Sequence, residues 1–250
     1  MQISFFEEFP TKENLSKTKH LQWPTKLYIA APSLEAFKSI KQKIKNKKIT
    51  ETIYWPVLNQ KEGYWISPFA GPKALLRIFK ELQNQTIPVM LDLELPHYRK
   101  LGLYLKAFSN FKTNKRLIQN FIINYPGQIY LAEYFIEGKL KNKLLRELGL
   151  HYDDNKIKII KMMYHSVHNF TEDSMRARCL EGQKQHGDNF CVALGTIATG
   201  IKGDEPVLSA EQLKKDLEIV KNSGVKESII FRLGGMNKNY SKCISEVVES

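Results

Sequence analysis

The chain has 250 residues, of which 42% are hydrophobic and 26% are charged, and its formal charge is +12 at pH 7. These proportions are typical of a globular protein with a sizeable core, and no apolar stretch reaches the roughly 20 residues that span a bilayer. The first eight residues lack the basic region and long apolar run of a secretory signal, so we expect a cytoplasmic protein. Three widely spaced cysteines without a CxxC pair argue against a disulfide framework and a thiolate zinc site.

Eight short apolar runs recur along the chain, at residues 3–6, 26–30, 52–55, 88–91, 128–131, 157–163, 190–194 and 228–231. Helix-compatible segments separate most of them, and no linker or low-complexity stretch divides the chain. Eight such units are typical of a (β/α)₈ TIM barrel, an α/β fold whose active site lies at the C-terminal ends of the strands. We therefore predict a single barrel domain over residues 1–250.

The intervals between the runs predict the helices. The interval 11–21 is short and lysine-rich, so we expect an irregular first helix there. Helices are expected to begin near Ser33, Pro72, Thr171 and Ser209, where capping residues or an N-terminal proline precede apolar periodicity. The segment between the fourth and fifth runs predicts two helical pieces, 97–111 and 114–123. A further helix, 139–148, ends before a glycine.

Two carboxylates stand at the end of the fourth run, in the segment Leu91-Asp92-Leu93-Glu94. Asp92 and Glu94 are two residues apart in an expected strand, so their side chains point to the same side. Close carboxylates repel one another, which favours keeping a proton on one of them for general acid catalysis. Alternatively, one carboxylate caps the next helix or pairs with a nearby cation.

These residues resemble family-18 glycoside hydrolases, the chitinase family, whose strand four ends in Asp-x-x-Asp-x-Asp-x-Glu, often followed by Tyr-Pro. The resemblance implies that Glu94 is the general acid and that Asp92 orients a substrate N-acetyl group; Leu95-Pro96 follows them. In the family, strand six often reads Met-x-Tyr-Asp. Here Met162-Met163-Tyr164-His165 stands at that place, which implies that Tyr164 binds the N-acetyl group.

The resemblance covers about a dozen residues, and the chain departs from the family pattern at several of them. Met90 and Ile87 replace the two earlier aspartates of strand four, and His165 replaces the strand-six aspartate. Strand eight ends in Arg232, followed by Leu-Gly, where the family usually has tryptophan.

Further strand-end residues complete the predicted sugar site. We expect Glu133 to be a second catalytic carboxylate, and we expect substrate contacts from Glu8, Tyr54, Trp55, Tyr164, His165 and Arg232. Of the adjacent Glu7 and Glu8, at most one should face the pocket. No cofactor is predicted, but Glu133 with Asp92 or Glu94 and His165 could instead bind a divalent metal.

A different signal follows the last two runs, where glycines cluster at Gly195, Gly200, Gly234 and Gly235. Loops after strands seven and eight are a common phosphate site of these barrels, and Arg232 could add a charge-assisted contact. The same glycines equally fit tight turns. The leading prediction is therefore hydrolysis of a glycosidic bond or related sugar derivative. The alternative is a lyase or isomerase acting on a phosphorylated metabolite.

Lysines account for the positive charge and concentrate on two expected outer helices. They are Lys38, Lys41, Lys43, Lys45, Lys47 and Lys48, and then Lys139, Lys141 and Lys143 with Arg146. A solvated surface explains them, and a non-catalytic barrel that binds an anionic partner is a third alternative. Nucleic acid is not expected as a partner, because the aromatic residues do not interleave with the lysines. The sequence leaves the oligomeric state open.

Overall fold

The structure is a computed structural model, and it describes residues 1–94, 101–134, 139–152, 154–201 and 203–249. Side chains are described for all of these except residues 101–109, 134 and 139–142. Leu95, Pro96 and the predicted helix start near residue 97 lie outside the described residues. In the described part of the chain, no helix combines the length and apolar character needed to cross a membrane.

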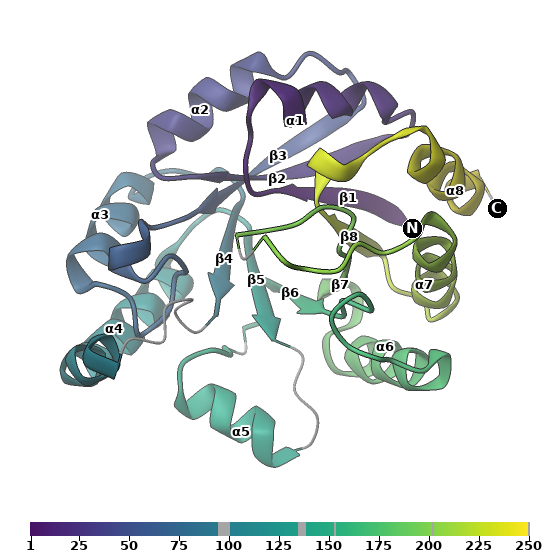
Figure 1. Cartoon of the computed structure of the whole chain (residues 1–250). Helices are drawn as coiled ribbons and strands as arrows, with labels where there is room; N and C mark the ends of the chain where they lie inside the picture. The colour runs from purple at the N-terminus through teal and green to yellow at the C-terminus, as the bar shows by residue number, and fades with distance from the viewer. Residues whose placement is uncertain (95–100, 135–138, 153, 202, 250) are drawn as a thin grey trace. The chain divides into compact units, whose positions relative to one another are not determined.

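Eight parallel strands form a closed barrel in chain order, which confirms the predicted fold class (Figure 1). The strands are β1 (Gln2–Glu7), β2 (Thr25–Ala31), β3 (Ile49–Pro56), β4 (Val89–Leu93), β5 (Ile129–Tyr134), β6 (Ile157–Met162), β7 (Phe190–Gly195) and β8 (Glu227–Phe231). Each contains most of one predicted apolar run. The runs are nearly continuous because a barrel strand is covered by helices on one face and by packed side chains on the other.

The α-helices are α1 (Lys12–Ser16), α2 (Leu34–Lys43), α3 (Pro72–Leu82), α4 (Leu101–Asn124), α5 (Lys139–Glu147), α6 (Glu172–His186), α7 (Ala210–Asn222) and α8 (Lys238–Glu249). Short 3-10 helices add η1 (Lys17–His20), η2 (Gln60–Glu62), η3 (Gly187–Asn189) and η4 (Leu233–Gly235). The first interval is irregular, as predicted. The caps are also confirmed at Thr171 and Ser209, whose side chains accept from the backbone N–H groups of Ser174 and Gln212.

Helix α4 corrects one prediction, because it runs without a break through Lys112 and Thr113. Asn114, the polar residue that follows them, is fully buried on this helix. Its amide donates to the carbonyl oxygens of Pro68 and Ala70 at 3.0 and 2.9 Å. A buried polar side chain with such partners is tolerated where a helix packs against its neighbours. The run of polar residues near position 112 therefore does not mark the end of a helix.

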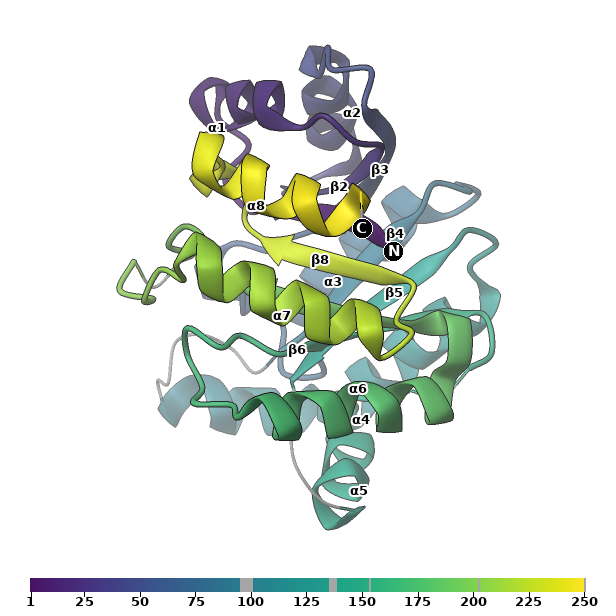
Figure 2. The same cartoon turned by 90° about the vertical axis from the view of Figure 1, so that its right-hand side faces the viewer.

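Contacts group the chain into two compact units, and each is described by itself. The first contains residues 1–30, 40–53 and 160–250, and the second contains residues 31–39 and 54–159. In the first unit, α6, α7 and α8 follow one another beside β8 (Figure 2). The prediction that residues 1–250 form one domain stays a prediction.

Strand register in the first unit separates an inner from an outer face. Ser4 and Phe6 of β1 pair with Ile229 and Phe231 of β8, and paired residues of parallel strands share a face. Ser4 and Tyr28 of β2 both donate to the buried Glu227 carboxylate, at 2.7 and 3.0 Å. These residues therefore face the barrel interior, and Phe5 and Glu7 face the helices.

In the second unit, Tyr54 identifies the face of the sheet that helices cover. Its ring lies 5.1 Å from that of Phe37, a buried residue of α2. Tyr54 pairs with Val89 of β4, and β4 pairs with β5 so that Leu93 lies opposite Glu133. Tyr54, Val89, Leu93 and Glu133 accordingly lie on the helix-facing side. The residues that alternate with them face the barrel interior.

Candidate active site

Asp92, the carboxylate inside the end of β4, points into the barrel. Asp92 alternates with the helix-facing Leu91 and Leu93, so its side chain leaves the strand on the interior face, where it is 4% exposed. Glu94 follows directly after the strand, two residues on, and is half-buried. Asp92 thus lies at the C-terminal end of the strand, where barrel enzymes carry their active sites, and continued alternation would turn Glu94 to the same side.

Glu133 does not join them, which corrects its predicted role. It lies opposite Leu93 in the β4–β5 register and therefore points to the helix-facing side. Its carboxylate is fully buried and contacts His151 Nδ1 at 3.0 Å through Oε1 and 2.9 Å through Oε2. A buried carboxylate held this way stabilises the packing between the strand and the chain that precedes β6. We do not include Glu133 in the candidate active site.

The two aromatic residues of β3, Tyr54 and Trp55, point to opposite faces of the sheet. Tyr54 is fully buried against α2, and burial, with a smaller contribution from the Glu81 charge, raises the pKa of its phenol well above the usual value. This is the environment of a core residue, so its predicted contact with substrate is corrected. Trp55 alternates with it and faces the interior, where its ring stacks on Trp65 with centroids 6.2 Å apart and planes 9° apart. The edge of Tyr64 packs on Trp65 at 4.3 Å.

In the first unit, the ends of β1, β6 and β8 bring Glu8, Tyr164 and Phe231 towards one another. The Tyr164 and Phe231 rings lie 5.8 Å apart. Gly200, in the loop after β7, lies against the same group. A methyl group on its Cα would be 2.9 Å from Phe231 Cζ and 3.0 Å from Glu8 Oε2. Of the adjacent Glu7 and Glu8, it is thus Glu8 that lies with the interior-facing residues, as the prediction of a single inward carboxylate requires.

Glu205 is a residue of this site that the sequence did not single out. Its Oε2 accepts from the Gly200 N–H at 3.0 Å, and its Oε1 would be 3.1 Å from a methyl group on Gly200. Glu8 and Glu205 therefore both lie against the same glycine. Glu205 lies in a loop, Gly200 to Ser209, without periodicity or strand-end position, so no pattern in the sequence could have identified it.

Arg232 binds other groups of the protein, which corrects its predicted contact with substrate. It is 9% exposed, and its Nη1 donates to Glu7 Oε1 at 3.1 Å while Nε donates to the Thr199 carbonyl at 2.8 Å. Burial raises the pKa of the Glu7 carboxyl, and the Arg232 charge and the N–H groups of Phe9 and Gly234 act against that rise. Glu7 and Arg232 form a buried ion pair beneath the loops.

The glycine loops do not present a phosphate site. The N–H groups of Gly200 and Gly234 donate to carboxylates, those of Glu205 and Glu7, and the Gly235 N–H donates to the Arg232 carbonyl. The glycines are needed for close approach: a methyl group on Gly235 would lie 1.8 Å from the Ile197 carbonyl oxygen, and one on Gly195 would lie 2.7 Å from that of Phe231. Carboxylates already accept from two of these N–H groups and a backbone carbonyl accepts from the third, so tight packing explains these glycines.

His165 points away from the strand-end group and towards α7. Its Nδ1 lies 3.2 Å from Oδ1 of Asp216, a fully buried residue of α7, and Gln212 donates to the same oxygen at 2.9 Å. Burial raises the pKa of Asp216, against the smaller effects of Gln212 and His165. The predicted substrate contact of His165 stays a prediction.

The predicted metal set is not assembled. Asp92 and Glu133 lie on opposite faces of neighbouring strands, and His165 is bound to α7. In the described part of the chain, no three histidine, cysteine or acidic side chains gather as metal ligands would. The six lysines at positions 38 to 48 are all exposed, as the prediction of a solvated basic surface requires.

No protein family model matches the chain, and no curated protein sequence matches it. Solved structures do share its architecture. The glycoside hydrolase domain of PgaB (BpsB) from Bordetella bronchiseptica superimposes with a TM-score of 0.57 at 10% identity, covering 98% of this chain and 97% of that one. A chitinase from Chromobacterium violaceum gives 0.55 at 10% identity, covering 100% and 99%. A D-tagatose 3-epimerase-like protein gives 0.51 at 12% identity, covering 100% and 97%. At these identities the likeness establishes the barrel fold alone.

Proposed function

We propose that the protein hydrolyses a glycosidic bond, or a related bond in a sugar derivative, with Glu94 as the general acid. The observation that carries the proposal is the position of Asp92 and Glu94. Asp92 faces the barrel interior at the end of β4, where barrel enzymes perform catalysis, and Glu94 follows two residues later. The sugar-active barrels among the similar structures add support at the level of fold.

In the proposed reaction, Glu94 donates its proton to the glycosidic oxygen as the bond from that oxygen to the anomeric carbon breaks. The anomeric carbon then acquires the oxygen of water, and the proton released from that water restores the acid. Asp92 carries negative charge next to the developing positive charge of the sugar ring and orients the substrate. The resemblance of the β4 end to chitinases suggests an N-acetyl sugar as the substrate.

The aromatic residues of β3 suit this substrate class. Trp55 faces the interior on β3, the strand next to β4, because it alternates with Tyr54, which pairs with Val89. Stacked indole rings offer apolar surface to the C–H face of a sugar ring, although Trp55 is only 2% exposed in this structure. The contribution of Trp55 is therefore to shape the wall beside the carboxylates.

Glu94→Gln tests the proposal. This variant keeps the shape of the side chain but removes the proton donor, and loss of general acid catalysis typically costs about 10²–10⁴-fold in rate. Hydrolysis of aryl β-N-acetylglucosaminide and aryl glucoside substrates should fall by at least about 100-fold while the unfolding midpoint stays within about 2 °C. A wild-type chain that hydrolyses a substrate, with a Glu94→Gln variant that retains full activity, would show that Glu94 is not the acid.

A further inference from the structure

One part of the first unit carries most of the chain's positive charge. Residues 14–30 and 40–50 contain eight lysines and no aspartate, glutamate or arginine, so they supply +8 of the formal charge of +12. Lys26 is paired with Glu227 and Glu51, at 3.0 and 3.6 Å. The other seven lysines form no ion pair with a described residue. Nothing in the proposed hydrolysis uses these lysines.

A side-chain hydrogen bond joins two of the lysine-rich segments. The Asn46 amide, in the loop before β3, donates to the carbonyl oxygen of Thr18 in η1 at 2.6 Å and to that of Leu21 at 3.3 Å. Two lysines flank Asn46 and two flank Thr18, so folding gathers four cations around one contact. They are Lys17, Lys19, Lys45 and Lys47, of which Lys17 is half-buried and the others are exposed.

The start of α8 brings a fifth cation to the same place. Ser241 Oγ donates to the His20 carbonyl at 2.6 Å, and Lys238 lies one turn before Ser241 on this helix. Burial lowers the pKa of His20, and the charges of Lys19, Lys17 and Lys238 lower it further. Positive charges from two separate segments thus act on one imidazole. We call Lys17, Lys19, Lys45, Lys47 and Lys238 the basic patch.

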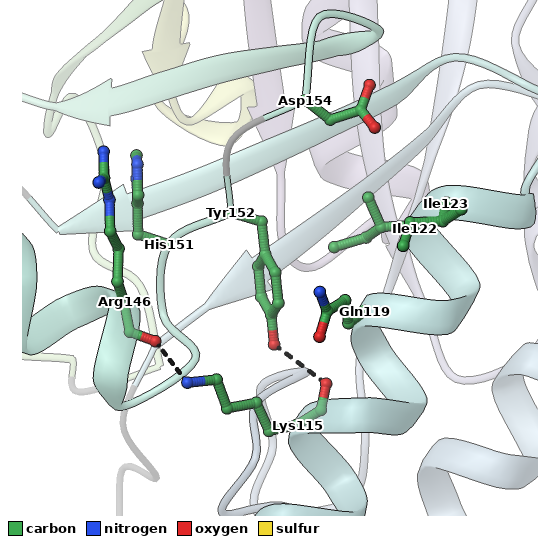
Figure 3. A pocket seen from close by; sticks show the side chains of 8 residues that line it. All are labelled: Lys115, Gln119, Ile122, Ile123, Arg146, His151, Tyr152 and Asp154. Atoms are coloured by element: carbon green, nitrogen blue, oxygen red, sulfur yellow. Dashed lines mark hydrogen bonds between the residues drawn. The ribbon is translucent and has the colours of Figure 1, made fainter.

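Two lysines elsewhere in the chain show how the protein holds an ammonium group. Beside the cavity in Figure 3, Lys115 donates to the backbone carbonyl of Arg146 at 2.8 Å. Lys214 of α7 pairs with Glu246 of α8 at 2.5 Å. In the basic patch, Lys45 donates to a backbone carbonyl one turn earlier at 3.1 Å, and no lysine meets an acidic side chain of the described residues. Like charges gathered in this way repel one another, and an anionic partner relieves the repulsion.

The residue types around the basic patch favour a diffuse anionic surface over a nucleic acid. Arginine, which binds phosphate groups in a bidentate manner, is absent from residues 14–30, 40–50 and 237–242. The aromatic residues of these segments, Trp23, Tyr28 and Tyr240, are buried, so they expose no ring on which a base could stack. Lysine ammonium groups are compact point charges that need no matching geometry. An anionic bilayer suits them, because its surface attracts clustered lysines without shape complementarity.

We propose that the basic patch binds the surface of an anionic lipid bilayer through electrostatic attraction. Each lysine near such a surface strengthens binding by about fivefold, so the five lysines act together although each contact is weak. The loop that carries Lys45 and Lys47 lies at the N-terminal ends of β2 and β3, since the Thr25 N–H donates to the Lys48 carbonyl at 2.8 Å. Barrel enzymes carry their active sites at the opposite ends of the strands, so contact through this loop leaves those ends open.

The test is sedimentation of the full chain with vesicles made of equal parts phosphatidylserine and phosphatidylcholine, at about 0.15 M salt. We expect the protein to pellet with these vesicles and to stay in solution with pure phosphatidylcholine vesicles. Added NaCl should release it, because salt screens exposed charges. A protein that stays in solution with the phosphatidylserine vesicles would overturn the proposal. Tighter binding to mixed-sequence duplex DNA at the same salt would also overturn it and would identify nucleic acid as the partner.

Two double variants separate the basic patch from net charge. Lys45→Gln/Lys47→Gln removes two charges from the patch, and Lys184→Gln/Lys215→Gln removes two exposed lysines from α6 and α7. We expect the first to weaken vesicle binding by at least about tenfold and the second by less than about twofold, with both unfolding midpoints within about 2 °C of the wild type. Equal weakening by both would mean that net charge alone attracts the protein, and it would overturn a specific patch. Because the readout is binding, its failure is independent of any failure of the Glu94→Gln test.

Discussion

Asp92 on β4 and Glu133 on β5 lie on neighbouring strands, one residue apart in register, with side chains on opposite faces of the sheet. The register places Ala132 opposite Asp92, and Glu133 opposite Leu93. The two carboxylates therefore cannot act as a pair on one substrate. Asp92 faces the barrel interior, whereas Glu133 faces the helices and contacts His151.

This relationship predicts different outcomes for two isosteric substitutions. Asp92→Asn should lower the rate of glycoside hydrolysis by at least about 30-fold, because it removes a charge beside the reacting sugar. Glu133→Gln should leave the rate within about threefold but lower the free energy of unfolding by about 1–3 kcal/mol, because it weakens a buried contact with His151. Kinetics and urea unfolding of both variants check these values. A Glu133→Gln variant that is stable but inactive would contradict this assignment and show that Glu133 is needed for catalysis.

The buried pair of Glu7 and Arg232 predicts a large loss of stability when only one partner is removed. Arg232→Met leaves the fully buried Glu7 carboxylate without its cation, and this should lower the free energy of unfolding by about 3–5 kcal/mol at pH 7. The double variant Glu7→Gln/Arg232→Met should recover part of the loss. If Arg232 instead served only a substrate, the single variant would unfold like the wild type.

The same pair has a pH dependence with a definite sign. Burial raises the pKa of Glu7 above its unfolded value, so the stability linked to its protonation is present at low pH and lost as the pH rises through the folded pKa. Arg232→Met removes a charge that opposes this rise. The stability deficit of the variant should therefore shrink between pH 7 and pH 5, as measured by urea unfolding at each pH.

Tyr54→Phe distinguishes a core residue from a substrate contact. The Tyr54 hydroxyl is buried and has no hydrogen-bond partner among the described residues. Removing an unsatisfied buried hydroxyl should leave the free energy of unfolding unchanged or raise it by about 1 kcal/mol. Activity should be unchanged, and a selective rise in KM would instead place the hydroxyl on the substrate.

Asp216 predicts a second pH effect, which its amide variant can isolate. Its folded pKa is raised, mainly by burial, so it favours the folded state below the unfolded carboxyl pKa and loses that contribution as the pH rises. In the wild type, the free energy of unfolding should fall between about pH 4 and the raised folded pKa of Asp216, and Asp216→Asn should make this fall smaller. Unfolding curves across this range check the sign. A steeper fall in the variant would contradict it.

The sequence by itself determined the barrel and the ends of its strands. Apolar runs repeat because each strand is buried on both faces, and the spacing of Asp92 and Glu94 places them on one side of β4 whatever surrounds the strand. Helix caps such as Ser209 also depend on short stretches of chain, because the cap hydroxyl accepts from a backbone N–H three residues later. These features need only short stretches of chain.

Only the tertiary structure decided which strand-end residues face the interior. Glu133 and Tyr54 look like site residues in the sequence, but strand register and helix packing turn them outward. Arg232 forms an ion pair with Glu7. The glycines are required by close backbone contacts between loops that are far apart in the chain. His151 gains its partner, Glu133, only through folding. Residue type and spacing do not encode these long-range contacts, because each depends on where a second, distant segment comes to rest.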